Sequence, residues 1–317
     1  MKVPILILYP HSRCNCRCVM CDIWKTTEIR EITPADLDRQ AADIEALQVR
    51  WVIFSGGEPL MHSSLFHLCA RLRSMGIRIT ILSTGLLLEK YAAAIVEHVD
   101  EVIVSLDGPA EIHDRIRRVP SAFDRMSAGI QALRRIEPRF PVAARCTVQK
   151  ANHASLGATV EAARAMGLRS ISFLAADLAS TAFNRPEGWP VERQDEVGLT
   201  AAEIAALERE LDALPADGFV LESPEKLRRI ARHFRAHLGA VDPAAPRCNA
   251  PWVSAVVESD GTVRPCFFHA PLGTLAEEPL ARILTGPRAV EFRRTLNVAQ
   301  NPICRRCVCS LYLPEPL

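Results

Sequence analysis

The sequence predicts an α/β fold: a partial (β/α)6 barrel followed by a small cysteine-rich lobe that contains a β-hairpin. Two observations support this fold. Six runs rich in Val, Ile and Leu alternate with helical stretches up to residue 176, and the pattern then gives way to loops, helices and cysteines. Strands alternating with helices imply a parallel sheet with right-handed crossovers. Because no clear seventh unit follows, we expect an open barrel and not a closed eight-stranded one.

The predicted strands are short apolar runs bounded by polar or turn-forming residues. They cover residues 3–9, 51–55, 77–83, 101–106, 141–148 and 170–174. Helices are expected between them, for instance over residues 34–47, where Thr33 can act as the N-cap, and over residues 153–166.

The pattern changes after residue 176. A long loop is expected over residues 177–199, followed by helices near 200–213 and 224–238, and DPAAP at 242–246 resembles a linker. We therefore expect a barrel over residues 1–215, a helical linker over residues 216–247 and the cysteine-rich lobe over residues 248–317.

Charge and composition exclude several classes of partner. The 317 residues carry 38 basic and 37 acidic side chains, so nothing points to nucleic acid or to an anionic membrane surface as a partner. The sequence has no stretch long and apolar enough to span a bilayer, and MKVPILILYP lacks a signal-peptide cleavage site. We expect a cytoplasmic protein, in which eleven cysteines favour metal ligation over disulfides.

Four of the cysteines lie in CNCRCVMC, residues 14–21, directly after the first strand. Cys14, Cys18 and Cys21 are spaced so that a compact loop can wrap three thiolates around one 4Fe–4S cluster. The fourth iron would then have no protein ligand, while Cys16 is an extra thiol inside the loop. A zinc site and a redox-active thiol pair are the alternatives.

Small, hydroxyl and acidic residues follow the next strands at their carboxyl ends. They occur in SGGEP (55–59), in Ser83-Thr84-Gly85 and in SLDGP (105–109), and the fifth strand carries Arg145. Each alone is compatible with an ordinary turn, a cap or a structural ion pair. Together they gather at the edge of a parallel barrel where reactive groups are found.

In these residues the chain resembles the radical S-adenosylmethionine (SAM) superfamily, whose hallmark is CxxxCxxC after the first strand. The resemblance covers roughly residues 5–175, although Met20 stands where the family often has an aromatic residue. It implies a SAM-binding 4Fe–4S cluster, with Glu58 near the SAM amino group. It implies that SAM is bound by Gly56, Gly57, Glu58, Ser83, Ser105, Asp107 and Arg145. Apart from the resemblance, Lys25 is a candidate for positive charge near Glu58.

The C-terminal cysteines suggest a second metal centre. WVSAVVES, Asp260-Gly261 and TVRP predict a β-hairpin that brings Cys248 and Cys266 together. With the CxxC of Cys304 and Cys307, four ligands are available, and Cys309 is a spare. Zinc and free cysteines are the alternatives. The lobe resembles the twitch domain, the short relative of the SPASM domain, which implies an auxiliary 4Fe–4S cluster, here in its fully protein-bound version.

The resemblance implies reductive cleavage of SAM to a 5′-deoxyadenosyl radical, which takes a hydrogen atom from the substrate. We expect a small-molecule substrate that is oxidised or forms a new bond with help from the auxiliary cluster, and an electron donor such as flavodoxin or ferredoxin. A peptide- or protein-modifying maturase is the alternative, although the cysteine loop begins at residue 14 and leaves no room for a leader-binding domain. A non-enzymatic iron–sulfur or zinc protein would leave SGGEP and SLDGP unexplained.

The substrate itself is not evident from the sequence. Asp177, Asn184 and Arg185, in the predicted loop after the sixth strand, are the candidate substrate contacts, because that loop can face the mouth of the barrel. His11, Arg13 and Trp252 are weaker candidates. For each, a solvated loop position or core packing is the plain alternative.

Overall fold

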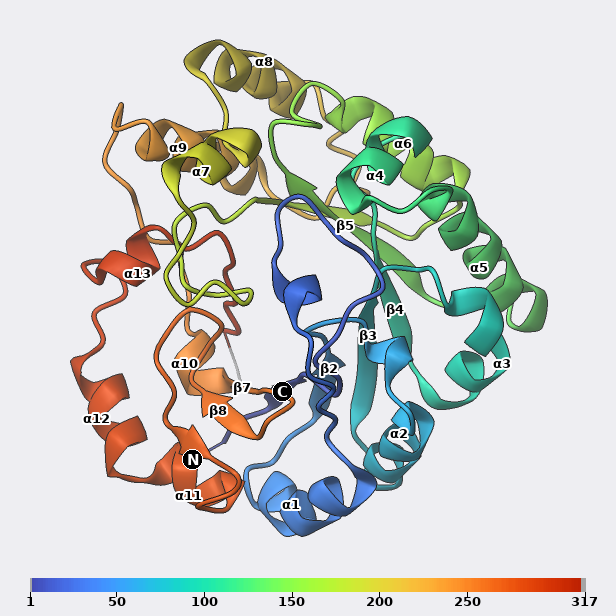
Figure 1. Ribbon diagram of the computed structural model, residues 1–317, viewed down its shortest axis with the longest axis vertical. Helices are drawn as coiled ribbons and strands as arrows, with labels where there is room; N and C mark the ends of the chain where they lie inside the picture. The colour runs from blue at the N-terminus through green and yellow to red at the C-terminus, as the bar shows by residue number, and fades with distance from the viewer. Residues whose placement is uncertain (1, 315–317) are drawn as a thin grey trace.

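The computed structural model describes residues 2–314 and shows one curved sheet lined on its outside by helices (Figure 1). The strand order is β6-β5-β4-β3-β2-β1-β7-β8-β9, and β1 to β6 are parallel. The strands are β1 (Ile5–Leu8), β2 (Trp51–Phe54), β3 (Arg78–Ser83), β4 (Glu101–Ser105), β5 (Val142–Val148), β6 (Ile171–Ala175), β7 (Ser254–Val257), β8 (Thr262–Arg264) and β9 (Gly273–Thr274).

Helices connect the parallel strands and continue after them. They are α1 (Pro34–Ala46), α2 (Leu65–Ser74), α3 (Leu88–His98), α4 (Ala110–Arg117), α5 (Ala122–Ile136), α6 (Leu156–Ala165), α7 (Val191–Val197), α8 (Ala201–Asp212), α9 (Pro224–His237), α10 (Ala250–Val253), α11 (Leu280–Thr285), α12 (Pro287–Thr295) and α13 (Pro302–Arg305), with 3-10 turns η1 (Ile23–Lys25) and η2 (Pro59–Met61). Thr33 caps α1 as predicted, because its hydroxyl accepts from Asp36 N–H and the Asp36 carboxylate accepts from Thr33 N–H.

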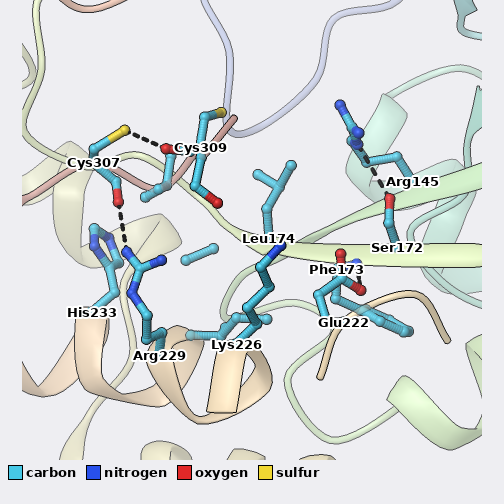
Figure 2. A pocket seen from close by; sticks show the side chains of 14 residues that line it. Arg145, Ser172, Phe173, Leu174, Glu222, Lys226, Arg229, His233, Cys307 and Cys309 are labelled. Atoms are coloured by element: carbon cyan, nitrogen blue, oxygen red, sulfur yellow. Dashed lines mark hydrogen bonds between the residues drawn. The ribbon is translucent and has the colours of Figure 1, made fainter. Parts of the chain in front are cut away.

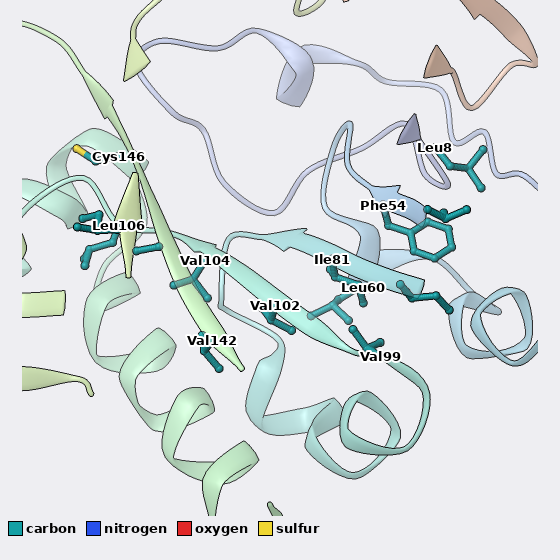
Figure 3. Packing of buried hydrophobic residues seen from close by; sticks show 14 of the residues in the cluster. Leu8, Phe54, Leu60, Ile81, Val99, Val102, Val104, Leu106, Val142 and Cys146 are labelled. Atoms are coloured by element: carbon teal, nitrogen blue, oxygen red, sulfur yellow. The ribbon is translucent and has the colours of Figure 1, made fainter. Parts of the chain in front are cut away.

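The barrel strands alternate between two environments. Phe54, Ile81 and Val104 are fully buried and pack in one cluster with residues of the outer helices, such as Leu68 of α2 (Figure 3). Their neighbours along the strands, for example Ile103, point the other way and are only partly buried. The outer face of the sheet therefore forms the core, and the inner face is left to line a cavity.

The predicted partial (β/α)6 barrel is confirmed, with strand ends within two residues of those expected. The predicted loop over residues 177–199 is wrong in part, because α7 forms within it. Pro190 precedes the first residue of α7 with an extended backbone, and Val197 anchors the helix by burial.

The C-terminal hairpin also forms as predicted, with Gly261 at φ +83° and Asp260 accepting from the N–H of Thr262. It does not form a separate layer, however. β7 pairs in parallel with β1, from Ile5 opposite Ser254 to Leu8 opposite Val257, and so extends the barrel sheet. The helix of the predicted linker, α9, packs on β6. The three-part division of the chain stays a prediction.

Candidate active site

The cysteine loop lies at the carboxyl end of β1 and crosses the open end of the barrel (Figure 1). Its backbone is held from two sides. The carbonyl of Arg13 accepts from Glu58 N–H at 2.9 Å, and Arg17 N–H donates to the carbonyl of Arg117 at the end of α4 at 3.1 Å. Two neighbouring loops of the barrel therefore fix where the cysteines lie.

The thiols of this loop are close enough to influence one another. Burial, together with the nearby Cys18, raises the pKa of Cys21 to about 12, and the same two causes raise that of Cys14 further. The pKa of Cys18 is lowered to about 7, first by a hydrogen bond from Cys16 and also by Arg117, whose guanidinium lies 3.4 Å from its sulfur. Three thiols so close together cannot all ionise without added positive charge, which iron ions would supply.

Cys16 has a packing role as well. It is 1% exposed and packs with Leu86 and Ala122 beneath the loop.

In residues 2–314, no three His, Cys, Asp or Glu side chains are arranged to hold a single metal ion.

The SGGEP loop after β2 approaches the cysteine loop so closely that side chains would not fit. A Cβ atom on Gly57 would lie 2.0 Å from the carbonyl oxygen of Arg13. One on Gly56, whose φ is +92°, would lie 2.6 Å from the ring of Tyr9. Both glycines are therefore required by this contact between the two loops.

Glu58 is completely buried and holds the neighbouring loop after β3. Its carboxylate accepts hydrogen bonds from Thr84 N–H at 2.7 Å, from the Ser83 hydroxyl at 3.0 Å and from Leu60 N–H at 3.1 Å. Burial raises its pKa. The expected pairing with Lys25 is wrong, because the Lys25 ammonium lies 3.0 Å from Asp22 instead. Ser83 and Glu58 thus position the loops around the site.

Asp107 and Arg117 form a buried ion pair at 2.5 Å behind the cysteine loop. Asp107 also accepts from Thr147 N–H at 2.9 Å, so its carboxylate is fixed from two strands. Arg117 in turn contacts Cys18. Sequence reasoning missed Arg117; the signal was an arginine ten residues after Asp107, at the end of the helix that follows SLDGP.

Arg145 lies in the interior of the barrel. It stands opposite Ser105 in the sheet and donates to Ser172 at 3.3 Å. It faces the C-terminal cysteines and is not among the described residues that line the cavity at Gly56 and Gly57. The binding of SAM by Ser105 and Arg145 stays a prediction.

The segment between β6 and α7 covers the cysteine loop. Trp189 donates to the Asp22 carboxylate at 2.7 Å and Asn184 to the Asp22 carbonyl at 3.1 Å. Asp177 and Arg185 form a buried ion pair at 2.6 Å, and the guanidinium lies 4.2 Å from the ring centre of Trp189. These contacts shield the side of the loop next to Cys21.

A cavity of about 690 Å³ opens between this segment and the hairpin, and we call it the mouth cavity. Asn184 and Arg185 line it as expected, whereas Asp177 is not among its described lining residues. His11 also lines it, with its ring accepting from Arg13 N–H at 2.9 Å, and Trp252 lies instead in α10. Other residues around the mouth cavity are Tyr9, Gly56, Gly57, Glu258, Arg264, Phe267 and Phe268.

The five C-terminal cysteines line a second cavity of about 230 Å³, the interior cavity. Burial raises the pKa of Cys304 and of Cys309 to about 11, with contributions from Cys248 and Cys266. The remaining wall is mostly apolar and comes from the inner face of the barrel. Its lining includes Cys248, Cys266, Cys304, Cys307 and Cys309, with Ile7, Ile53, Leu82, Ile103, Arg145, Phe267 and Phe268.

Family models match both cysteine-bearing regions. The model of the Radical SAM superfamily matches residues 8–152, and that of the SPASM iron–sulfur cluster-binding domain matches residues 248–308. The chain contains a radical SAM domain followed by a SPASM domain. A radical SAM domain binds a 4Fe–4S cluster and SAM, and the SPASM domain binds a further iron–sulfur cluster. The cofactors expected from the sequence are therefore confirmed.

Curated relatives of this radical SAM protein include enzymes with different products. It is 33% identical to the AdoMet-dependent heme synthase of Methanosarcina barkeri over 49% of this chain and 45% of that one, less than half of its length. It is 28% identical to GTP 3′,8-cyclase 1 of Pseudomonas aeruginosa over 76% of this chain and 73% of that one.

Solved structures of radical SAM enzymes share the fold. anSMEcpe with bound AdoMet and the Cp18Cys peptide has a TM-score of 0.66 at 18% identity over 95% of this chain and 87% of that one. Streptococcus suis SuiB bound to precursor peptide SuiA has a TM-score of 0.66 at 14% identity over 98% of this chain and 72% of that one.

In residues 2–314, no helix has the length and apolar character needed to cross a membrane.

The close contact at Gly57 leads to a first prediction. Gly57→Ala is expected to push the SGGEP loop and the cysteine loop apart, lowering stability by about 1–3 kcal/mol and weakening SAM binding. Anaerobic thermal unfolding and equilibrium SAM binding measure the two effects. Gly157→Ala in α6 is the control, because its Cβ would contact only Glu210 at 3.7 Å. Equal effects of both substitutions would show that Gly57 is an ordinary loop residue.

Proposed function

We propose that this radical SAM enzyme removes a hydrogen atom from a small-molecule substrate and that the substrate is then oxidised or forms a new bond. When bound, the SAM-binding cluster supplies the electron that splits SAM into methionine and a 5′-deoxyadenosyl radical. One observation carries the proposal: the mouth cavity reaches from Gly56 and Gly57 to Phe267 and Phe268, directly beside Cys266. The mouth cavity therefore lies between residues that flank the cysteine loop, Ser12 and Ile23, and Phe267, the neighbour of Cys266.

For the SAM-binding cluster we assign Cys14, Cys18 and Cys21 as ligands. The donor set fits, because three neighbouring thiols lie in one loop whose backbone is fixed by hydrogen bonds. Arg117 places a positive charge beside Cys18, which stabilises the thiolate form. Asp107 holds Arg117 in place, so we assign it a positioning role.

SAM is assigned to the mouth cavity, next to the SGGEP loop. Gly56 and Gly57 line the cavity there. Tyr9 stacks on Phe267 with ring centres 6.0 Å apart, and Phe268 meets Phe183 at the same distance. These rings form an aromatic wall beside the proposed SAM position, and Trp189 holds the covering segment against Asp22.

For the auxiliary cluster we assign Cys248, Cys266, Cys304 and Cys307, with Cys309 as a fifth thiol in the same cavity. His269 lies close by, with its Nε2 3.3 Å from the sulfur of Cys304. A hydrogen bond from this ring to the thiolate would orient the ligand and tune the cluster. Because this cavity adjoins the mouth cavity through Phe267 and Phe268, the auxiliary cluster is within reach of an electron leaving the substrate.

Modification of a peptide is the second candidate. The solved structures of SuiB and anSMEcpe contain bound peptides, and the mouth cavity is large and open. The similarity to a heme synthase and to a GTP cyclase favours a small molecule. Incubation with candidate small molecules and with peptides, followed by mass spectrometry for a loss of hydrogen, separates the two.

The reaction class is tested by release of 5′-deoxyadenosine and methionine from SAM by the reduced, reconstituted protein. Glu58→Gln is expected to weaken SAM binding by about tenfold with unchanged iron, because an amide nitrogen would face the donors Thr84 N–H or Leu60 N–H. Glu89→Gln, on the exposed face of α3, is the matched control. If Glu58→Gln binds and cleaves SAM like the wild type, the placement of SAM at this loop is incorrect.

A further inference from the structure

A third pocket, of about 130 Å³, lies between β6, α9 and the C-terminal segment (Figure 2). We call it the side pocket. Its charged and polar lining comes from elements far apart in the sequence. These residues are Arg145, Glu222, Lys226, Arg229 and His233. Arg145 is also predicted to bind SAM, but neither the SAM site nor the proposed cluster ligands account for the other four side chains.

Positive charge is in excess in the side pocket. Arg145, Lys226 and Arg229 face it, and within residues 2–314 none of the three has a carboxylate at ion-pair distance. Glu222 is the single acid of the lining, and its carboxylate accepts from Phe173 N–H at 2.9 Å. His233 adds no charge near neutral pH, because burial lowers its pKa to about 4.

The hydrogen bonds of the cations leave donors free. Arg145 donates to the Ser172 hydroxyl at 3.3 Å and Arg229 to the Cys307 carbonyl at 3.3 Å, as Figure 2 shows. Each guanidinium has five N–H donors, so most remain available. For Lys226, no hydrogen bond of the ammonium group is found in the described part of the chain. Such unpaired cations around a small pocket are suited to an oxyanion.

The side pocket adjoins the interior cavity. Arg145, Cys307, Cys309 and Ser310 line both. The interior cavity has the apolar wall of the barrel strands, including Ile53 and Ile103. The auxiliary cluster is assigned to the cysteine side of the interior cavity, so a ligand whose apolar body lies along Ile53 and Ile103 can place an acidic group in the side pocket.

We propose that the side pocket binds an oxyanionic group, a carboxylate or a phosphate, of the enzyme's substrate, held by Lys226, Arg229 and Arg145. The substrate class is then an amphipathic acid whose apolar part lies toward the auxiliary cysteines. This inference rests on the proposed function for the identity of the ligand as substrate. The simpler role of these cations, neutralising the charge of the auxiliary cluster, accounts for Arg229 beside Cys307 but leaves Lys226 without a partner.

The test measures anion binding without SAM. Inorganic phosphate and ¹³C-labelled acetate are added in turn to photoreduced holoprotein that carries both clusters, and ³¹P and ¹³C relaxation reports binding near a paramagnetic centre. Lys226→Gln is expected to weaken binding by about tenfold, since it removes one charge-assisted donor. Lys226 is exposed, so the variant should fold. Lys90→Gln in α3, also exposed, should bind like the wild type.

The two anions distinguish a carboxylate from a phosphate as the preferred group. The proposal is overturned if wild type and Lys226→Gln relax both anions equally, or if the wild type relaxes neither. Because no SAM is present, these outcomes are independent of whether the protein cleaves SAM. A protein that binds phosphate at the side pocket but makes no 5′-deoxyadenosine would instead contradict the proposed function.

Discussion

Replacing Cys14, Cys18 and Cys21 together by alanine is expected to remove about half of the iron, from about eight to about four atoms per chain, and to abolish SAM cleavage. The SAM-binding cluster should be lost completely, because its three thiols lie in one loop. The auxiliary cluster should stay, because the C-terminal cysteines line a different cavity. Iron and sulfide analysis of anaerobically reconstituted protein measures the first effect. Chromatography of 5′-deoxyadenosine measures the second.

The matched control is Cys69→Ala. Cys69 is fully buried in α2, within the helical outer core and not in the cysteine loop, so its replacement should leave iron and SAM cleavage unchanged. Some loss of stability is expected from the small cavity that it creates. Retention of all the iron by the triple variant would contradict the ligand assignment. If wild-type protein handled without oxygen contained stoichiometric zinc and no iron, the prediction of two iron–sulfur clusters would be wrong.

The parts of the fold that the sequence predicts are those with local signals. The six barrel strands are continuous apolar runs, and the cap at Thr33 depends only on Asp36 three residues later. The pairing of β7 with β1 could not be predicted, because it joins the two ends of the chain and depends on how the barrel closes. The sequence therefore indicates the hairpin but not its place in the sheet.

The same distinction holds for the site. SGGEP predicts close backbone approach, and the distances at Gly57 confirm it. The partner of Glu58 was predicted wrongly, because a nearby lysine was the local choice and the real donors come from the loop after β3. Arg117 was missed because it lies in a helix with several charged residues, where most arginines face solvent. Only the packing of the end of α4 behind the cysteine loop shows that this arginine is buried next to the site.

A Cys304→Ala, Cys307→Ala double variant is expected to lose the auxiliary cluster while the SAM-binding cluster stays. None of the hydrogen bonds that fix the cysteine loop, to Glu58 and to the end of α4, involves the C-terminal segment. The variant should therefore bind SAM and release 5′-deoxyadenosine in an uncoupled reaction, with little product from its substrate. Iron content, SAM cleavage and product yield are measured on the same preparation.

Cys309→Ala gives the matched control for the double variant. Cys309 lines the same interior cavity but is the fifth thiol, so both clusters and product formation should persist. If this single variant loses the auxiliary cluster, Cys309 is a ligand in place of one of the four assigned cysteines. Both clusters in soluble double variant would contradict the assignment of Cys304 and Cys307. Full product formation without the auxiliary cluster would leave that cluster a structural role only. Such a role would add to the hydrogen bond from Arg229 to the Cys307 carbonyl, which ties this segment to α9.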